Sequence, residues 1–388
     1  MKKAIHIYLS TFENESRILK QTKSIIDHKI VDQVIVLARG KEGLPEFENI
    51  SPGRSVVRVR SEFMKDKIPL RGFGKITLLL KMMDSVLKFY KIIKKEKPLF
   101  INLHQVALLP LIPIFKLASR KSKFIYDAHE LETETNGLAG NRKNIYKKIE
   151  SKFIKSFVQV FVVSPSIEKW YRDKYGIKNI ATVMNCPIYK SSIKNNLFRE
   201  EFGISNESRI YLYQGALFKG RGIEILLDAF AEINDPKYTL ICMGYGEFES
   251  EIKEYAKKYK NIFFKTAVSP DVVLNFTSSA DVGISMIENV CLSYYYCLPN
   301  KLFEYLMAEI PCIVSDMPEM RNYINKYNTG VVCKGTDKQS LINSILEMDN
   351  FDYQRFQQEV EKCKVVFSWE TQEKVMINEY RNLLLNHA

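Results

Sequence analysis

The sequence has 388 residues, of which 46% are hydrophobic and 12% are aromatic. That length exceeds the size at which one hydrophobic core usually stops growing, so we expect two domains, and the composition excludes an intrinsically disordered chain. The sequence has seven cysteines, an odd number, and no two of them form a C-x-x-C motif. This pattern indicates free thiols in a reducing compartment rather than a disulfide framework or a zinc site.

Charge is distributed unevenly along the chain. Residues 1–190 carry 36 Lys and Arg against 18 Asp and Glu, a net charge of +18, whereas residues 191–388 carry 21 against 27, a net charge of −6. Halves of opposite sign suggest two domains with different partners. A basic half attracts phosphate groups in nucleic acid, anionic lipid or diphosphate-linked substrates, although lysines kept for solubility would leave the same pattern.

Short apolar segments alternate with longer amphipathic ones along both halves. Near-continuous apolar runs are typical of parallel strands buried on both faces, and the amphipathic segments predict helices between them. The alternation predicts an α/β protein with two doubly wound, Rossmann-like sheets. We expect strands at residues 5–9, 34–38, 56–59, 100–103, 124–126, 160–163, 210–213, 239–243, 262–264, 282–285, 313–315 and 330–333, and helices at 18–27, 76–94, 143–157, 223–233, 249–258 and 301–307.

A polar, strand-poor stretch near residues 186–205 marks the expected domain boundary. We therefore predict an N-terminal domain at residues 1–188, a C-terminal domain at 189–367 and a terminal amphipathic helix at 368–388. The longest apolar stretch, residues 106–115, is about half a membrane span and contains two prolines, so no transmembrane helix is expected. The start of the chain has no signal-peptide pattern, which predicts a cytoplasmic location.

Three glycines and two cations lie at residues 214–222, where an expected strand passes into an expected helix. A glycine such as Gly215 lets the backbone approach a ligand closely, and a helix N-terminus presents unsatisfied N–H groups to an anion. Ligands of doubly wound sheets bind beyond the carboxyl ends of the strands, so Arg221 would meet an anion there. A tight turn without a ligand is the alternative interpretation.

Residues 298–305 form a second candidate anion site. Pro299 is suited to precede a helix start and Asn300 to cap it, so that the first amides of the helix would point at an anion and Lys301 would add charge. Glu304, about one turn further on, could accept hydrogen bonds from sugar hydroxyls. The alternative is an ordinary capped helix with Glu304 in solvent.

Ionisable side chains crowd the end of the expected strand at 124–126, where Asp127, His129 and Glu130 follow one another. Such crowding exceeds what a structural turn needs, and His129 could donate to a phosphate or a sugar hydroxyl. The pattern lacks the paired histidines of metalloproteases, so no metal ion is expected. Asn14 and Arg17 follow the first strand in the equivalent position, where capping the next helix is the alternative role.

Several motifs of other enzyme classes are absent from the sequence. It contains no P-loop, no G-x-G-x-x-G after the first strand, no G-x-S-x-G elbow and no Asp-x-Asp manganese motif. No nucleic-acid module is recognisable, and the second half is acidic, so nucleic acid is not an expected partner. His104 closes another expected strand, and we assign it a structural role.

Taken in order, these segments resemble glycosyltransferase family 4, the retaining sugar transferases of the GT-B fold. The resemblance is strongest over residues 205–320 and extends weakly to both ends. It rests on the loop at 213–222, Met-Gly-Tyr-Gly at 243–246, Ala-Asp-Val-Gly at 280–283, Lys-Leu-Phe-Glu-Tyr at 301–305, Tyr-Asp-Ala-His-Glu at 126–130 and Ser-Trp-Glu at 368–370.

The resemblance implies two domains that face each other across a cleft, with the terminal helix crossing back to the N-terminal domain. It implies transfer, with retention, of a sugar from a nucleotide diphosphate donor, taken as UDP-linked, to a glycan or lipid-linked acceptor in surface polysaccharide or glycoconjugate synthesis. No metal or other cofactor is implied, because arginine and lysine would neutralise the leaving diphosphate.

The resemblance also implies the site residues. His129 would lie by the donor sugar and β-phosphate, Arg221 and Lys301 would neutralise the diphosphate, and Glu304 would hold the ribose hydroxyls. The remaining donor-binding positions are Gly215, Ala216, Gly244 and Asn300, and the acceptor side is lined by Asn14, Arg17, Asp127 and Glu130.

Two positions depart from the family pattern. Tyr296 stands eight positions before Glu304, where the family typically has a glutamate, and Ala216 stands where the family typically has an arginine. Both departures leave the identity of the donor sugar open, and diphosphate binding then depends more on Arg221 and Lys301.

The resemblance assigns the acceptor to the basic N-terminal half. We therefore expect peripheral attachment to anionic lipid on the inner face of a membrane. The expected contacts are Lys88, Lys91, Lys94, Lys95, Lys97, the apolar segment 106–115, Arg120, Lys121 and Lys123. Two other functions stay open: a nucleotide-sugar 2-epimerase of the same architecture, and a non-catalytic basic binding protein.

Overall fold

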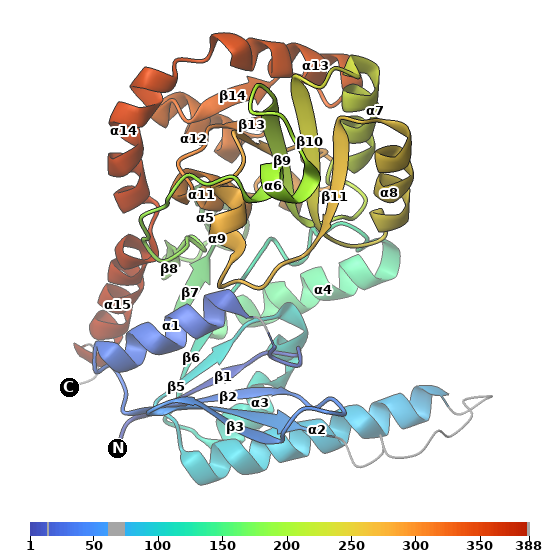
Figure 1. Ribbon diagram of the computed structural model, residues 1–388. Helices are drawn as coiled ribbons and strands as arrows, with labels where there is room; N and C mark the ends of the chain where they lie inside the picture. Colours follow the sequence, from blue (N-terminus) through green and yellow to red (C-terminus); the bar gives the residue numbers. More distant parts are fainter. Residues whose placement is uncertain (14, 61–73, 386–388) are drawn as a thin grey trace.

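The computed structural model describes residues 1–13, 15–60 and 74–385, and it divides them between two open sheets (Figure 1). The first sheet has the strand order β3-β4-β2-β1-β5-β6-β7-β8 and the second has the order β11-β10-β9-β12-β13-β14. Every pairing is parallel except that of β3 with β4. The prediction of two doubly wound, Rossmann-like sheets is therefore confirmed.

The N-terminal sheet is built from residues 3–182. Its strands are β1 (Lys3–Ile7), β2 (Gln33–Arg39), β3 (Phe47–Ser51), β4 (Arg54–Val59), β5 (Phe100–Leu103), β6 (Lys123–Asp127), β7 (Gln159–Val162) and β8 (Ile180–Thr182). Its helices are α1 (Ser16–Asp27), α2 (Gly74–Glu96), α3 (Ile112–Ala118), α4 (Gly140–Phe153) and α5 (Pro165–Tyr175), with short 3₁₀ turns at Val106–Leu111 and Ile154–Ser156.

The C-terminal sheet is built from residues 209–333. Its strands are β9 (Arg209–Ala216), β10 (Tyr238–Tyr245), β11 (Ile262–Thr266), β12 (Val282–Ser285), β13 (Cys312–Ser315) and β14 (Gly330–Cys333). Its helices are α6 (Leu197–Phe202), α7 (Ile223–Ile233), α8 (Glu249–Lys258), α9 (Val273–Thr277), α10 (Leu292–Tyr295), α11 (Asn300–Met307), α12 (Pro318–Tyr327), α13 (Lys338–Glu347) and α14 (Tyr353–Val366), with a 3₁₀ turn at Met348–Asn350.

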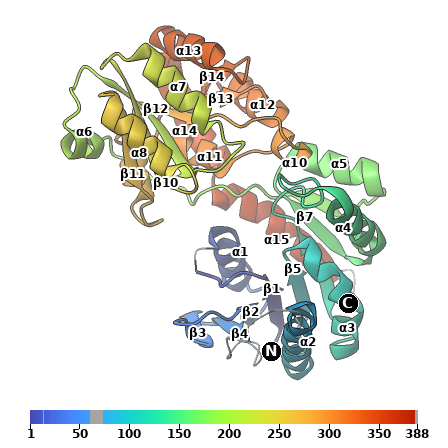
Figure 2. The same cartoon turned by 90° about the vertical axis from the view of Figure 1, so that its right-hand side faces the viewer.

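The last helix, α15 (Trp369–Leu385), returns to the N-terminal domain, as the fold prediction required (Figure 2). Its buried face packs with Phe100 and Phe161 of that domain's core. The indole N–H of Trp369 donates to the Ser24 hydroxyl over 2.9 Å, and the Tyr380 hydroxyl donates to Asn102 over 2.7 Å. Apolar burial and two polar contacts therefore fix the C-terminus against the first sheet.

Several elements differ from the sequence-based expectations. Strand β3 was not predicted because it is an edge strand with an exposed face, and its sequence contains no apolar run. Most apolar side chains of the segment 106–115, Val106, Leu109 and Phe115 among them, pack into the core, so the segment as a whole does not form the expected lipid-facing surface. Among the described residues, no helix is long and apolar enough to cross a bilayer.

Candidate functional site

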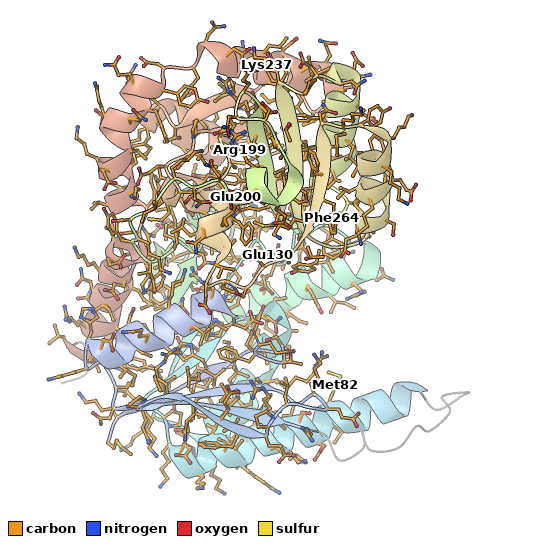
Figure 3. The ribbon with its side chains drawn as sticks, viewed as in Figure 1. Met82, Glu130, Arg199, Glu200, Lys237 and Phe264 are labelled. Carbon is orange, nitrogen blue, oxygen red and sulfur yellow. The ribbon has the colours of Figure 1, made fainter. Side chains whose placement is uncertain are left out.

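The loops at the carboxyl ends of the two sheets meet, and Figure 3 shows Glu130 at the level where they do so. The backbone N–H of Ser293, on α10, donates to the carbonyl of Glu134 over 3.2 Å, and its hydroxyl donates to the Glu130 carboxylate over 3.3 Å. A further contact between the two domains is made by the Ser164 hydroxyl, which donates to the carbonyl of Tyr296 over 2.8 Å. The predicted sites of both domains therefore lie at one seam, where ligands of such sheets bind.

Two cations flank the end of β9 without a carboxylate partner among the described residues. The Lys301 ammonium lies 3.5 Å from the ring centroid of Tyr213, and the Arg221 guanidinium lies 4.5 Å from that of Tyr294. Both side chains are half-buried. Aromatic faces attract cations but leave their N–H donors free, so both groups can still bind an anion.

Burial lowers the pKa of Lys301 well below its ordinary value, and the charge of Arg221 lowers it further. A half-buried pair of like charges is unfavourable until an anion arrives between them. Gly215, in the backbone beside them, has a φ of +116°, and a Cβ placed there would lie 3.9 Å from the Lys301 ammonium. The exposed backbone of Gly215 and the two cations thus form one positively charged corner.

Helix α11 starts at Asn300, one residue earlier than expected. Pro299 occupies the N-cap position, Asn300 is the first helical residue, and no side chain of the described residues caps the helix. The capping role predicted for Asn300 is therefore wrong, because the chain reaches helical geometry at Asn300 itself. The amides of the first turn are left without a side-chain acceptor, and they lie next to Lys301.

Glu304 and Gly244 have contacts that the sequence did not indicate. Glu304 accepts a hydrogen bond from the Gln214 amide, and burial raises its pKa. The Gln214 amide oxygen in turn accepts from the Thr277 hydroxyl over 2.8 Å. Gly244 is buried in β10, where a Cβ would come within 1.9 Å of the Gly215 carbonyl oxygen. A glycine at position 244 therefore allows β9 and β10 to pack closely at this point.

On the N-terminal side, Arg17 and Asp127 bind each other in the interior. Their side chains are 4% and 1% exposed, and the guanidinium contacts both carboxylate oxygens over 2.5–3.2 Å. Arg17 also donates to the carbonyl of Val183 over 2.6 Å. Although burial alone would raise the pKa of Asp127, the charge of Arg17 and hydrogen bonds from His104 and His129 hold it well below its ordinary value. The two residues expected on the acceptor side are therefore used to fix the loop.

Two histidines share the second oxygen of Asp127. His104 Nδ1 and His129 Nε2 each lie 3.1 Å from Oδ2, and they lie 3.1 Å from each other. His129 is 22% exposed and stacks on Tyr8. His104, Asp127 and His129 are close enough to share a metal ion, and the same carboxylate is paired with the Arg17 cation.

Four further positions were singled out in the sequence: Glu130, Asn14, Tyr296 and Ala216. Glu130 is an exposed residue, and desolvation of its carboxylate, which accepts from the Ser293 hydroxyl, raises its pKa. Asn14 lies outside the described residues. Tyr296 lines a cavity of about 500 Å³ together with Trp170 of α5. Ala216 ends β9, and its carbonyl accepts from the Tyr213 hydroxyl over 2.8 Å.

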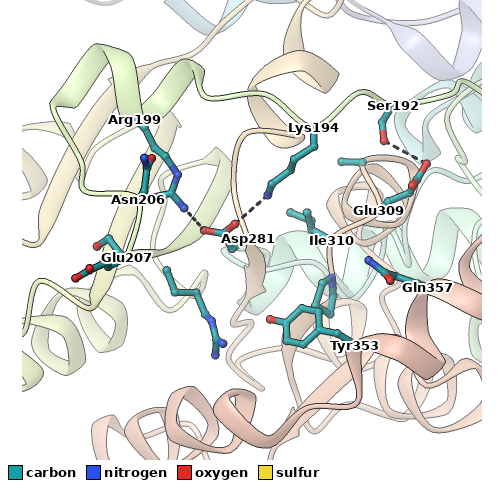
Figure 4. A pocket seen from close by; sticks show the side chains of 14 residues that line it. Ser192, Lys194, Arg199, Asn206, Glu207, Asp281, Glu309, Ile310, Tyr353 and Gln357 are labelled. Carbon is teal, nitrogen blue, oxygen red and sulfur yellow. Dashed lines mark hydrogen bonds and ion pairs between the residues drawn. The ribbon is translucent and has the colours of Figure 1, made fainter.

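A second cavity, of about 510 Å³, lies at the opposite edge of the C-terminal sheet (Figure 4). Lys194 and Arg199 enter it, but both bind the carboxylate of Asp281, over 2.9 and 2.8 Å. Lys194 and Arg199 are therefore each paired with a carboxylate, in contrast to Arg221 and Lys301.

Sequence reasoning missed the residues that support the cations. Tyr294 lies on a four-residue helix, and Glu288 accepts from the backbone N–H of Gly222 over 3.3 Å. No spacing pattern marks either residue, because each meets the loop at 214–222 through the fold. The three glycines of that loop were the only available signal.

Comparison with known proteins agrees with this geometry. Residues 194–359 match the family model for glycosyl transferases group 1. No curated protein matches the sequence. Among solved structures, sucrose-phosphate synthase of Thermosynechococcus elongatus superposes with a TM-score of 0.80 at 17% identity, covering 100% of both chains.

Two further structures show the same fold. HepE of Anabaena, solved with UDP and glucose, has a TM-score of 0.71 at 14% identity and covers 98% of this chain and 100% of its own. The catalytic domain of starch synthase IV from Arabidopsis thaliana, bound to ADP and acarbose, has a TM-score of 0.71 at 11% identity and covers 98% and 99%. The chain thus has the GT-B fold, and its family match and structural neighbours together support a glycosyltransferase.

Proposed function

We propose that the protein is a retaining glycosyltransferase that takes a sugar from a uridine diphosphate donor and passes it to a glycan or lipid-linked acceptor in surface polysaccharide or glycoconjugate synthesis. The observation that carries the proposal is the pair of half-buried cations Arg221 and Lys301, which have no carboxylate partner in the described part of the chain and lie beside the exposed backbone of Gly215. Uridine is favoured because HepE was solved with UDP and with UDP-glucose.

In the reaction, the bond between the sugar's C1 and the diphosphate oxygen breaks, and C1 bonds to an acceptor hydroxyl whose proton passes to the diphosphate or to water. Negative charge develops on the leaving diphosphate. Arg221, Lys301 and the first amides of α11 are held in place before that charge develops, so they stabilise it without reorganisation. These groups supply the charge that a metal ion supplies elsewhere, and we propose that the reaction needs none.

The test is a thermal-shift screen against UDP, ADP, GDP and CMP in the presence of a chelator. A ligand that binds only the folded state raises the melting temperature. We expect UDP to raise it and Arg221→Ala to remove most of the shift. Lys194→Ala, in the cavity of Figure 4, is the matched control and should keep the shift. If none of the nucleotides raises the melting temperature, the proposal is wrong.

We further propose that the lipid-linked acceptor is met at a membrane by α2 and α3. Met83 and Leu87 of α2 are 52% and 55% exposed, and Leu117 of α3 is 65% exposed. The two helices are in contact, and the exposed Lys91 and Lys94 share the face of α2 that carries Met83 and Leu87. Apolar side chains flanked by cations are the pattern of a surface that lies on anionic lipid.

Flotation with phosphatidylcholine vesicles, with and without phosphatidylglycerol, tests this surface. We expect recovery with vesicles only when the anionic lipid is present, and loss of recovery in the double variant Leu87→Gln, Leu117→Gln. The matched control is Leu346→Gln with Val365→Gln, two exposed apolar residues of the C-terminal domain. Equal flotation of both double variants would contradict the proposal.

A further inference from the structure

The buried histidines behind His129 determine which of its ring nitrogens carries a proton. Asp127 is the starting point, because its pKa is held well below the ordinary value and its carboxylate can only accept hydrogen bonds. Its Oδ2 atom lies 3.0 Å from Arg17 Nε, 3.0 Å from Gln21 Nε2, and 3.1 Å from both His104 Nδ1 and His129 Nε2. The two ring nitrogens also lie 3.1 Å from each other, but the carboxylate is the stronger acceptor and cannot donate. Each ring nitrogen therefore carries a hydrogen directed at Oδ2, and the contact between the two rings is not a hydrogen bond.

The same reasoning continues into the interior. Burial lowers the pKa of His104 to about 4, so its ring is neutral and its other nitrogen, Nε2, is bare. That nitrogen lies 2.9 Å from Nδ1 of His6, which must then be the donor. His6 is 1% exposed, and within the residues that the structure describes its own Nε2 has no hydrogen-bond partner. The chain of histidines thus ends in a buried lone pair that offers no route for a further proton.

At the other end of this row of histidines, His129 lies at the seam between the domains. Its Nε2 donates to Asp127, and its ring stacks on that of Tyr8, with ring centroids 5.4 Å apart. Its Nδ1 has no partner among the described residues. In the neutral ring this free nitrogen is bare, so it accepts a hydrogen bond and repels an anionic oxygen.

We infer that Asp127 and His104 act as positioning residues that lock His129 in the Nε2–H form, so that its free Nδ1 accepts from a hydroxyl of one of the two substrates and does not donate to the diphosphate. The inference rests on the proposed function only in identifying that hydroxyl as one of a sugar. Under this inference the two ends of the site bind different groups: Arg221 and Lys301 bind the diphosphate, and His129 binds a hydroxyl.

The tautomers are read directly from long-range ¹H–¹⁵N correlation spectra of protein labelled with [¹⁵N]histidine, at neutral pH and without ligand. We expect a protonated Nε2 and a bare Nδ1 for His129, and the less common Nδ1–H form for both His104 and His6. The single variants His129→Asn, His104→Phe and His6→Asn assign the signals. A protonated Nδ1 on His129, or an Nε2–H form of His104, would overturn the inference.

Adding UDP-glucose extends the test. The Nδ1 signal of His129 should move while staying unprotonated, and UDP alone should leave it in place. In Asp127→Asn, whose amide group can donate to His129, we expect the Nδ1–H form of His129 to appear and the melting shift caused by UDP to persist. His28→Asn, at the exposed C-cap position of α1, is the control. Protonation of Nδ1 on adding UDP-glucose would show that it meets the diphosphate, whereas absence of any UDP shift in the wild type would refute the proposed function and leave the tautomer result standing.

Discussion

The carboxyl-end edges of the two sheets carry their ionisable groups in opposite states. In the N-terminal domain Arg17 and Asp127 neutralise each other in the interior, and two histidines are tied to the same carboxylate. In the C-terminal domain Arg221 and Lys301 rest on aromatic rings without a carboxylate partner among the described residues. The first edge therefore favours a neutral group and the second an anion. The two edges differ in whether their charged side chains are paired in the folded protein, more than in how many charged residues their loops contain.

The largest expected effect comes from breaking the neutral edge. Arg17→Leu removes the partner of a carboxylate that is 1% exposed, and leaving a buried charge unpaired costs about 3–5 kcal/mol of unfolding free energy. Urea denaturation followed by circular dichroism measures the loss.

Lys23→Ala is the matched control for Arg17→Leu, because it removes an exposed ion pair with Asp27 on the same helix. Exposed pairs contribute little, so we expect a far smaller loss. Comparable losses in the two variants would mean that the Arg17–Asp127 pair does not hold the edge together.

The charged edge should show the opposite behaviour. Lys301→Ala is expected to weaken UDP binding at least tenfold, which corresponds to about 1.4 kcal/mol. Stability should not fall, because burial and Arg221 both disfavour the lysine's charge in the free protein. Isothermal titration calorimetry measures the affinity, and Lys257→Ala on the exposed face of α8 is the control. Unchanged affinity in Lys301→Ala would remove this residue from the donor site.

A smaller expected effect is the uptake of protons by Lys301 when UDP binds. The folded pKa of Lys301 lies below its unfolded value, so between these two values the folded state binds fewer protons and the lysine's contribution to stability increases as the pH rises. A bound diphosphate raises this pKa, so UDP binding should take up protons. Calorimetry in buffers of different ionisation enthalpy measures the number of protons taken up. The measurement is made at about pH 9, which is well above the second pKa of a phosphate, about 6. Lys301→Met should abolish the uptake, and equal uptake in this variant would assign it to another group.

Much of the fold could be predicted because the strands of doubly wound sheets are local apolar runs. The expected strand at 313–315 falls inside β13, Cys312–Ser315, and the expected strand at 210–213 falls inside β9, Arg209–Ala216. Strands β3 and β8 and helices α3, α5, α6, α9, α10 and α12 to α14 were not expected. In β3 one exposed face breaks the apolar pattern on which the prediction relied.

The candidate site was predictable only in its local parts. Glycines at 215, 220 and 222 and the start of α11 mark the charged edge in the sequence. The pairing of Arg17 with Asp127 joins residues 110 positions apart, and the aromatic support of Arg221 comes from a different loop. Neither periodicity nor spacing in the sequence indicates contacts of this kind. Arg17 and Asp127 were therefore expected on the acceptor side, whereas the structure buries them.

Hydrogen–deuterium exchange with and without UDP tests the central claim most directly, because it maps a bound nucleotide without any assumption about the sugar or the acceptor. The account predicts slower exchange in peptides that contain residues 214–222 and 299–305, and unchanged exchange in those that contain 127–134. Slower exchange confined to 127–134, or to the cavity around Lys194 and Arg199, would contradict it.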